Sequence, residues 1–120
     1  MNALNQRPGL VLAIDTSTRS SLVLLGGDQP DAVSRREVQY RHGSHVLAQV
    51  DEVLAESGHS IDAVTAVAVG TGPGSFTGLR VGLATAKTLA YARSLPIVGV
   101  SSADALRRAV AGSAGAPADI

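Results

Sequence analysis

The architecture of the chain follows from residues 64–93, which read VTAVAVGTGPGSFTGLRVGLATAKTLAYAR. This segment begins with a short apolar run, Val64–Val69, whose valine content is typical of a strand buried on both faces. A glycine-rich loop follows, and a helical pattern then continues to about Arg93. Because another apolar run comes next, at Ile97–Val100, the segment predicts two parallel strands joined by a helical crossover.

The residues before this unit predict three strands and a helix. Apolar or alternating runs at Leu10–Ile14, Ser21–Leu25 and Ala32–Tyr40 are separated by short, turn-forming connections, which favours an antiparallel meander. From Ser44, apolar side chains recur with helical spacing up to a predicted stop at Gly58. The stripe consists of Val46, Leu47, Val50, Val53 and Leu54.

The predicted element order is βββαβαβα, in which the last helix is a short one over residues 103–110. Right-handed crossovers between the strands near residues 10, 64 and 97 require a mixed five-stranded sheet of order 3-2-1-4-5 with flanking helices, a three-layer α/β unit. We expect a disordered N-terminus at 1–9, this unit at 10–111, and a linker or frayed tail at 112–120.

Composition limits the function classes. The 120 residues suffice for one domain, and the absence of cysteine excludes a disulfide framework, a cysteine-based zinc site and a thiol nucleophile. Ten basic and ten acidic side chains cancel, and only two Tyr and one Phe are aromatic, which argues against a free-standing nucleic-acid binder. No run approaches the roughly 20 apolar residues of a membrane span. The sequence therefore predicts a soluble, cytoplasmic protein with no membrane partner.

The helix predicted after the glycine loop has small residues along one ridge, where they recur every four positions. They are Gly78, Gly82, Ala86 and Ala90. A ridge of small side chains lets another helix approach closely, and this helix is apolar or small nearly all round, as expected of a helix covered on two sides. The alternative is that the small residues only allow tight packing on the chain's own sheet. Spacing alone leaves both alternatives open.

The glycine-rich loop, Gly70–Phe76, does not match the established phosphate or nucleophile motifs. A P-loop needs a lysine after its last glycine, but the only lysine in the chain is Lys87. The glycine spacing differs from the dinucleotide fingerprint, and Ser75 is not centred between glycines as in a nucleophile elbow. The loop can present backbone N–H groups to an anion, or it can be a tight turn that caps a helix.

Few other side chains suggest a site. His42 and His45 are three residues apart, as metal ligands can be, but no cysteine or matching carboxylate accompanies them, and His59 is isolated. A solvated turn is the simpler interpretation, and we assign no metal. Asp15 ends the first strand, where α/β folds place site residues. It can hold a metal-bound water or a phosphate, or it can form a turn with the amides that follow it.

Three segments in this order resemble the TsaB (YeaZ) family. They are AIDTST at 13–18, GTGPGSFTGLRVGLATAK at 70–87 and PIVGVSS at 96–102, with His42 ahead of the first helix. The run GPGSFTGLR is the most specific of them, and the resemblance covers about residues 10–110. It implies an actin-like ATPase (ASKHA) fold, of which this chain would be the N-terminal lobe, with the family's second lobe absent.

The resemblance implies a non-catalytic dimerisation or assembly subunit of the complex that makes N6-threonylcarbamoyladenosine at position 37 of tRNA. Such a subunit docks on the catalytic subunit TsaD, works with the ATPase TsaE, forms a homodimer when alone and meets tRNA only through the complex. An alternative is a nucleotide-binding, ATPase-like enzyme of the actin, heat-shock chaperone and sugar kinase superfamily. The resemblance assigns no cofactor to this chain but leaves open ATP or ADP at the interface of the complex.

The resemblance also implies roles for three sets of residues, none of them catalytic or metal-binding. The partner interface would lie on the first two helices, at Gly78, Gly82, Ala86, Ala90, Val46 and Val50. The signature loop comprises Gly72, Pro73, Gly74, Ser75, Phe76, Thr77, Gly78 and Arg80. A phosphate would face Asp15, Thr16 and Ser17, although Ser17 and Thr18 stand where the superfamily has glycines.

Overall fold

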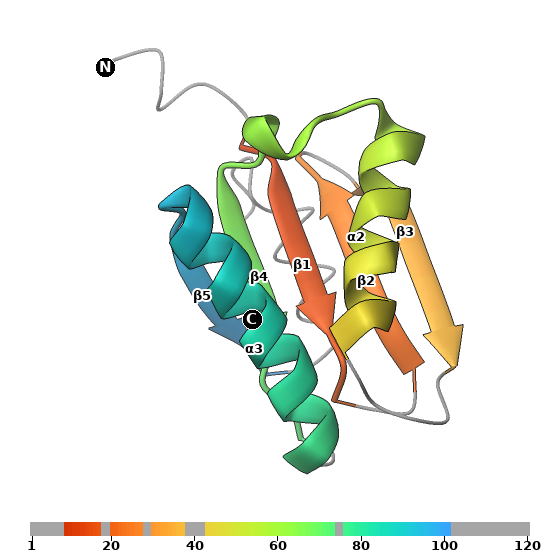
Figure 1. The fold of residues 1–120 in the computed structure, drawn as a ribbon, viewed down its shortest axis with the longest axis vertical. Helices are drawn as coiled ribbons and strands as arrows, with labels where there is room; N and C mark the ends of the chain where they lie inside the picture. The colour runs from red at the N-terminus through yellow and green to blue at the C-terminus, as the bar shows by residue number, and fades with distance from the viewer. Residues whose placement is uncertain (1–8, 18–19, 28–29, 38–42, 74–75, 102–120) are drawn as a thin grey trace.

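The structure is built on a mixed sheet of five strands (Figure 1). Residues 9–17, 20–27, 30–37, 43–73 and 76–101 are described, in a computed structural model of the chain. The elements are β1 (Val11–Asp15), β2 (Ser20–Gly26), β3 (Pro30–Glu37), α2 (Gly43–Ser57), the 3-10 turn η1 (Ile61–Ala63), β4 (Ala66–Gly70), α3 (Phe76–Arg93) and β5 (Ile97–Val100). Helices α2 and α3 lie side by side on one face of the sheet.

The strand order is β3-β2-β1-β4-β5, which confirms the order predicted from the sequence. β1 pairs antiparallel with β2 and parallel with β4, while β2 and β3 are antiparallel and β4 and β5 are parallel. The connection from the meander to β4 runs through α2, and the connection from β4 to β5 runs through α3. β1 is therefore the central strand, and its carboxyl end meets the loop that leads from β4 into α3.

The structure differs from the sequence prediction mainly at element ends. β3 already begins at Pro30, which the sequence places before the strand. A proline is tolerated there because the first residue of an edge strand need not donate to the ladder. The turn η1 has no counterpart in the sequence prediction. Residues 1–8, the helix predicted at 103–110 and the tail predicted at 112–120 lie outside the described residues.

The main core lies between the sheet and the two helices. α2 packs on β2 and β3, and α3 packs on β4. Branched aliphatic side chains fill this layer, and each that follows is at most 1% exposed: Leu12, Ile14 and Val23 from the sheet, Val46 and Val53 from α2. Full burial of one such side chain stabilises the fold by about 1.5 to 3 kcal/mol. The apolar stripe predicted on α2 thus holds this helix on the sheet, except for Leu47, which is 50% exposed.

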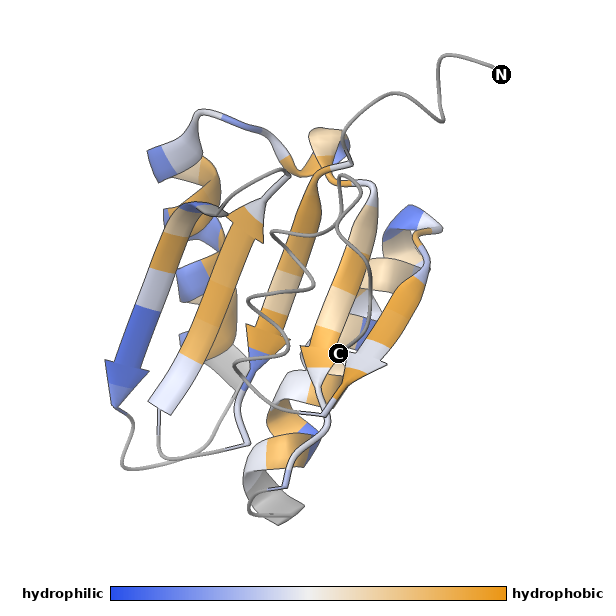
Figure 2. Ribbon diagram, turned by 180° about the vertical axis from the view of Figure 1, so that it is seen from behind, coloured by the Kyte–Doolittle hydropathy of each residue, from blue (hydrophilic) through white to orange (hydrophobic). Residues whose placement is uncertain are grey.

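The opposite face of the sheet is apolar as well (Figure 2). Ala13, Leu22, Leu24 and Ala68 form its centre and are at most 4% exposed. Both faces of β1 are therefore buried, as its continuous apolar run predicts. Within the described ranges the helices cover only the first face, and the last predicted helix lies outside those ranges.

One polar side chain fastens α2 to the antiparallel part of the sheet. Gln49 is fully buried, and its Oε1 accepts a hydrogen bond from the hydroxyl of Ser21 at 2.6 Å. Its Nε2 donates to the backbone carbonyls of Ser21 and Ser34 at 2.8 and 3.0 Å. The amide therefore ties α2 to both β2 and β3, and its donors and acceptor are all used.

Gln49→Leu nearly conserves the volume of the side chain but removes these bonds, and it leaves the buried Ser21 hydroxyl without its acceptor. We expect the free energy of unfolding, measured by urea denaturation, to fall by about 2 to 3 kcal/mol. Glu56→Gln, an exposed change on the same helix, is the control and should stay within about 0.5 kcal/mol of the wild type. A Gln49→Leu variant as stable as the wild type would show that the hydrogen bonds of Gln49 make no net contribution to the stability of the fold.

Both helices end in the same backbone motif. At the end of α2, Gly58 has φ 78° and the N–H of His59 bonds back to the carbonyl of Leu54 at 3.2 Å. At the end of α3, the corresponding bond, 2.8 Å long, closes over Ser94, which has φ 55°. These are Schellman motifs, in which the residue after the helix adopts a left-handed conformation. Gly58 confirms the helix stop predicted from the sequence, whereas α3 ends with a residue that carries a Cβ.

Substitutions at these two helix ends should change the free energy of unfolding in opposite directions. Ser94→Gly should raise the free energy of unfolding by about 1 kcal/mol, because the left-handed conformation is strained for a residue with a Cβ. Gly58→Ala should lower it by about 1 kcal/mol, and that cost is purely conformational because no heavy atom lies within 4 Å of the added Cβ. Thermal or urea denaturation measures both. A destabilising Ser94→Gly would contradict the motif at the end of α3.

Candidate functional site

The turn that follows β1 is fastened into the first turns of α3 by one side chain. Thr16 is buried, its Oγ1 accepts a hydrogen bond from the N–H of Gly82 at 2.8 Å, and the same hydroxyl donates to the carbonyl of Gly78. In a regular α-helix these two backbone groups would bond to each other. The hydroxyl thus stands between two backbone groups of α3 and sets the distance between the helix and the carboxyl end of β1.

Two glycines make room for this turn. A Cβ at Gly82 would collide with Oγ1 of Thr16, and a Cβ at Gly70, the last residue of β4, would collide with the carboxylate of Asp15. In both places a side chain of the β1 turn lies directly against the backbone of the next element. The glycines are therefore explained by close approach within the chain.

The carboxylate of Asp15 is used within the same turn. Its Oδ1 accepts hydrogen bonds from the backbone N–H and the hydroxyl of Ser17 at 2.7 and 2.6 Å, the arrangement of an Asx turn. Its Oδ2 is buried and accepts no hydrogen bond within the described part of the chain. Since the hydroxyls of Thr16 and Ser17 donate internally, these three side chains offer a phosphate neither a free donor nor a positive charge.

The glycine loop connects the end of β4 to β5 as well as to α3. The N–H and the hydroxyl of Thr71 donate to the carbonyl of Val100 at 2.7 and 3.2 Å. Gly72 has φ 106°, a conformation that favours glycine. Gly74 and Ser75 lie outside the described residues. In the described part of the loop, Thr71 thus ties the end of β4 to β5, and Gly72 supplies a backbone conformation that other residues rarely adopt.

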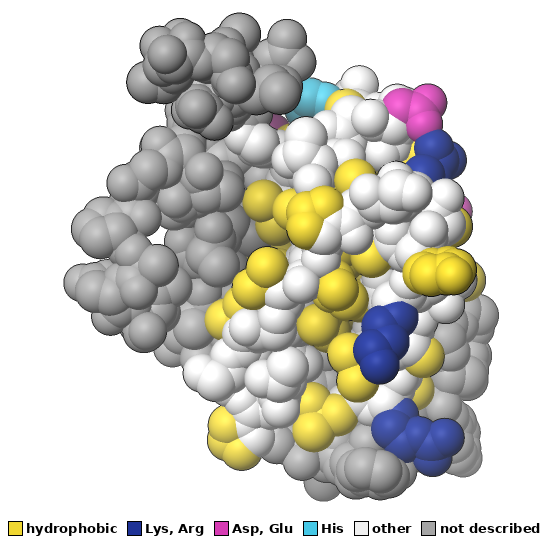
Figure 3. Space-filling view, turned by 90° about the vertical axis from the view of Figure 1, so that its left-hand side faces the viewer, with side chains coloured by type: hydrophobic (Ala, Val, Ile, Leu, Met, Phe, Trp, Pro, Cys, Tyr) yellow, Lys and Arg dark blue, Asp and Glu magenta, His cyan; other side chains and the backbone are white. Residues whose placement is uncertain are grey.

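The outer side of the helical layer is partly apolar and carries charge of opposite sign on its two helices. Leu47 on α2 is 50% exposed and Leu83 on α3 is 36% exposed. Figure 3, which views the side of α3 and β5, shows apolar side chains with basic ones among them. The charged residues of α3 are Arg80, Lys87 and Arg93, all basic. Those of α2, histidine aside, are Asp51, Glu52 and Glu56, all acidic.

Comparison with known proteins places the chain in a family. Residues 8–118 match the family model described as TsaD, tRNA N6-adenosine threonylcarbamoyltransferase. Two proteins named tRNA threonylcarbamoyladenosine biosynthesis protein TsaB are similar to the chain, at 40% identity over 100 residues for that of Haemophilus influenzae and 39% over 92 residues for that of Escherichia coli. The chain belongs to this family, in its TsaB (YeaZ) group. The matches cover 82% and 77% of the chain and 42% and 40% of those two proteins.

Solved structures of the TsaB (YeaZ) group have the same fold. A protein of Pseudomonas aeruginosa, described as uncharacterized with similarity to peptidase YeaZ, has a TM-score of 0.75 and 34% identity, over 84% of this chain and 47% of that one. YeaZ from Pseudomonas aeruginosa has a TM-score of 0.71 and 34% identity, over 78% and 45%. The fold is the actin-like one that the sequence resemblance implies, the family acts in threonylcarbamoyladenosine biosynthesis, and the chain spans less than half the length of these relatives.

In this TsaB-family chain the ridge of small residues on α3 faces the chain's own sheet. Gly78 and Gly82 are buried beside Thr16, and Ala86 and Ala90 are 0% and 4% exposed. Of the two alternatives that the spacing left open, tight packing on the sheet is the one that accounts for the ridge. The expectation that these residues contact a partner is corrected, because their surfaces are already occupied within the chain.

The same correction applies to the interface residues expected on α2. Val46 and Val50 are 1% and 4% exposed and belong to the core between the helix and the sheet. Both side chains lie on the inward face of this amphipathic helix, so they attach the helix to the sheet and are not accessible to a partner. A partner that docks on these two helices must therefore contact the exposed residues of the same helices, such as Leu83 and Ala84.

The remaining predicted residues do not gather into a site. His59 lies at the surface, 3.6 Å from a carboxylate oxygen of Asp31, and His42 lies outside the described residues. In the part of the chain that the structure describes, no group of three His, Cys, Asp or Glu side chains is placed to hold a metal ion. Phe76 begins α3, and Arg80 is exposed one turn further on. None of the described helices is both long enough and apolar enough to cross a membrane.

The sequence interpretation missed the polar contacts that hold both helices. Gln49 stands three residues after Val46 and four before Val53, which puts it on the buried face of α2. A polar side chain on such a face has to find partners, and that position was the available signal. For Thr16 the only signal in the sequence was Gly82, a glycine inside the predicted helix, and it stands 66 residues away.

A double-mutant cycle tests the contact between Thr16 and α3. Gly82→Ala alone should lower the free energy of unfolding by about 2 to 3 kcal/mol, because the new methyl collides with the Thr16 hydroxyl. In a Thr16→Ala background the same substitution should cost less than about 1 kcal/mol, since the helix can then close its own bond from residue 82 to residue 78. Urea denaturation of the four proteins measures the coupling. Equal costs in both backgrounds would contradict the contact.

Proposed function

We propose that this chain is the N-terminal lobe of a non-catalytic assembly subunit that docks on a TsaD-like catalytic subunit, in the complex that forms N6-threonylcarbamoyladenosine in tRNA. The observation that carries the proposal is the outer face of α2 and α3, where Leu47 is exposed on one helix and Leu83 on the other, among charged residues. The proposed interface therefore lies on the same two helices that the resemblance to the TsaB family implies, but it consists of their exposed residues.

The charges on this face support a partner of related fold. Glu52 is paired with Arg36 and Arg93 with Asp62 within the chain, which leaves Asp51 and Glu56 as acidic groups on α2 and Lys87 as a basic group on α3. A partner with the same two helices, rotated by about half a turn, sets its acidic helix against the basic one of this chain. A second copy fits this description, which supports a homodimer when the chain is alone. The family model that matches this chain is described as TsaD, so a TsaD-like subunit is expected to offer similar helices.

The interior of the site supports a role in assembly and not in catalysis. The Asp15 carboxylate and the Thr16 and Ser17 hydroxyls are engaged in bonds that shape the turn. The described residues place no metal-binding cluster, and the chain has no net charge with which to hold tRNA by itself. The transfer chemistry would therefore belong to the TsaD-like subunit, nucleotide hydrolysis to a TsaE-like ATPase, and tRNA would bind through the complex.

Docking is tested by co-elution with the cognate TsaD-like subunit on size-exclusion chromatography. Leu83→Glu replaces an exposed apolar side chain with a carboxylate in the proposed interface, opposite the partner's acidic helix, and should weaken binding by about a hundredfold or more, which abolishes co-elution. Val33→Glu is the matched control. Val33 is 41% exposed, and it pairs with Leu24, whose side chain lies on the sheet face opposite the helices. We expect this control to co-elute like the wild type.

Circular dichroism establishes that both variants are folded. Co-elution of Leu83→Glu at the level of Val33→Glu would contradict the proposed face. Failure of the wild type, both as this chain and as a chain extended to the length of its relatives, would contradict the proposed partner. Gly82→Leu is not a useful test, because it would break the contact with Thr16 whether or not a partner binds.

A further inference from the structure

The two edges of the sheet differ in chemistry. β3 forms one edge and carries Arg35, Arg36 and Glu37, charges of the kind that discourage pairing with another strand. β5 forms the other edge, and its sequence IVGV contains no charge. Ile97 and Val98 are 39% and 54% exposed. Proteins normally protect an edge strand, so an apolar and exposed one is an edge at which a further strand can be added.

The backbone of β5 has hydrogen-bonding groups to offer at this edge. The carbonyls of Pro96 and Val100 accept from the N–H groups of Val67 and Thr71, so they face β4. Because the groups of successive residues point alternately to the two sides of a strand, those of Ile97 and Gly99 face away from the sheet. β5 is the last strand of the described sheet, so no described strand lies on that side to pair with them.

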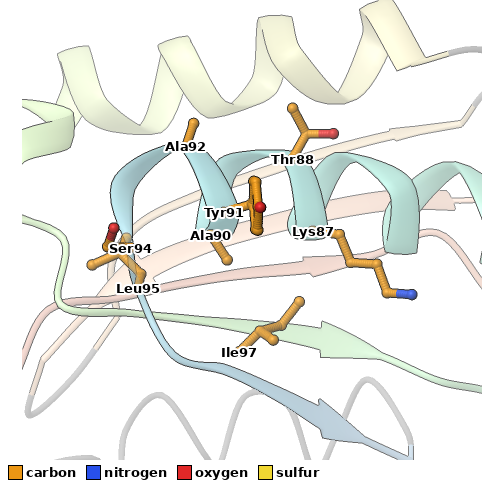
Figure 4. A pocket seen from close by; sticks show the side chains of 8 residues that line it. All are labelled: Lys87, Thr88, Ala90, Tyr91, Ala92, Ser94, Leu95 and Ile97. Carbon is orange, nitrogen blue, oxygen red and sulfur yellow. The ribbon is translucent and has the colours of Figure 1, made fainter.

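A groove lies beside this edge, between β5 and the last turns of α3 (Figure 4). Its volume is about 920 Å³, and its apolar lining includes Ala90, Leu95 and Ile97. Tyr91, which is 91% exposed, also lines it. In Figure 4 the side chain of Ile97 points from β5 toward α3. An extended segment laid along β5 would therefore meet apolar surface on the side that faces α3.

The charge at the groove is positive. Lys87 is its only charged lining residue, it is exposed, and it forms no ion pair with a described residue. α3 contains no acidic side chain that could neutralise it. A carboxylate is the group that complements an exposed ammonium at the rim of an apolar groove.

We propose that β5 and this groove bind an extended segment of a partner protein, which adds a sixth strand at the β5 edge. Main-chain bonds to Ile97 and Gly99 would hold it, an apolar side chain would pack against Tyr91, and an acidic one would lie at Lys87. This is β-strand addition, in which the backbone supplies affinity and the flanking pocket supplies specificity. Lys87 stands one helical turn after Leu83, so this surface adjoins the outer face of α2 and α3 and shares Lys87 with it.

The probes are two short synthetic peptides, one in which valine alternates with glutamate and one in which valine alternates with lysine. Gly99→Pro removes the outward N–H without touching the bonds to β4, and Gly99→Ala is its control because it adds the same Cβ near Thr71 but keeps the N–H. Lys87→Glu reverses the charge at the groove. Binding is followed by the amide NMR signals of residues 97 and 99 and by titration.

We expect the glutamate peptide to shift those amide signals and to bind Gly99→Pro about tenfold more weakly than Gly99→Ala. Lys87→Glu should transfer the preference to the lysine peptide. Equal binding to Gly99→Pro and Gly99→Ala, or binding that leaves residues 97 and 99 unperturbed, would overturn the proposal, as would failure of both peptides to bind. Concentration-dependent self-association that Gly99→Pro abolishes would assign the edge to a second copy instead, and would overturn it too.

Discussion

The hydroxyl of Thr16 sits between two backbone groups of α3, and the arrangement of the lobe depends on that contact. It brings the helix so close to the end of β1 that residue 82 has no room for a Cβ. The adjacent Asp15 carboxylate lies equally close to Gly70, at the end of β4, so that residue has no room for a Cβ either. A single turn thus explains why glycines occur on both sides of the loop between β4 and α3, and why the small ridge of α3 lies inward.

Periodicity and length sufficed to predict the strands and the two described helices, because each depends on patterns a few residues long. The sheet order then followed from the right-handedness of the crossover connections. The end of α2 was equally local, since Gly58 carries its own conformational preference. The end of α3 was not predicted in the same terms, because Ser94 adopts a left-handed conformation that its residue type does not favour. Gln49 contacts a residue 28 positions away in sequence, and Thr16 contacts residues 62 and 66 positions away. No local pattern encodes contacts of this range.

The ridge of α3 shows a second limit of sequence reasoning. Spacing establishes that Gly78, Gly82, Ala86 and Ala90 share one side of a helix, but not which way that side points. The structure turns it toward β1 and β4, and so a partner would meet exposed residues that stand between them in sequence, such as Leu83 and Ala84. The same limit applies to the turn after β1. Residues at the carboxyl ends of strands can serve a ligand, and their position alone does not show that Asp15 Oδ1, Thr16 and Ser17 are bonded to the chain itself.

Once the interior is accounted for, the chemistry of the lobe lies on its surfaces. The outer face of α2 and α3 is a surface of side chains, with acidic residues on α2 and basic residues on α3. A twofold rotation would place the acidic helix of one copy against the basic helix of another. A homodimer and a complex with a TsaD-like subunit that both use this face exclude each other, so their balance depends on relative affinity and concentration. The edge of β5 is different in kind, since it offers backbone groups and a basic, apolar groove. Because the two surfaces meet at Lys87, one turn after Leu83, an acidic partner at β5 would also reduce the positive charge that α3 offers on the helical face.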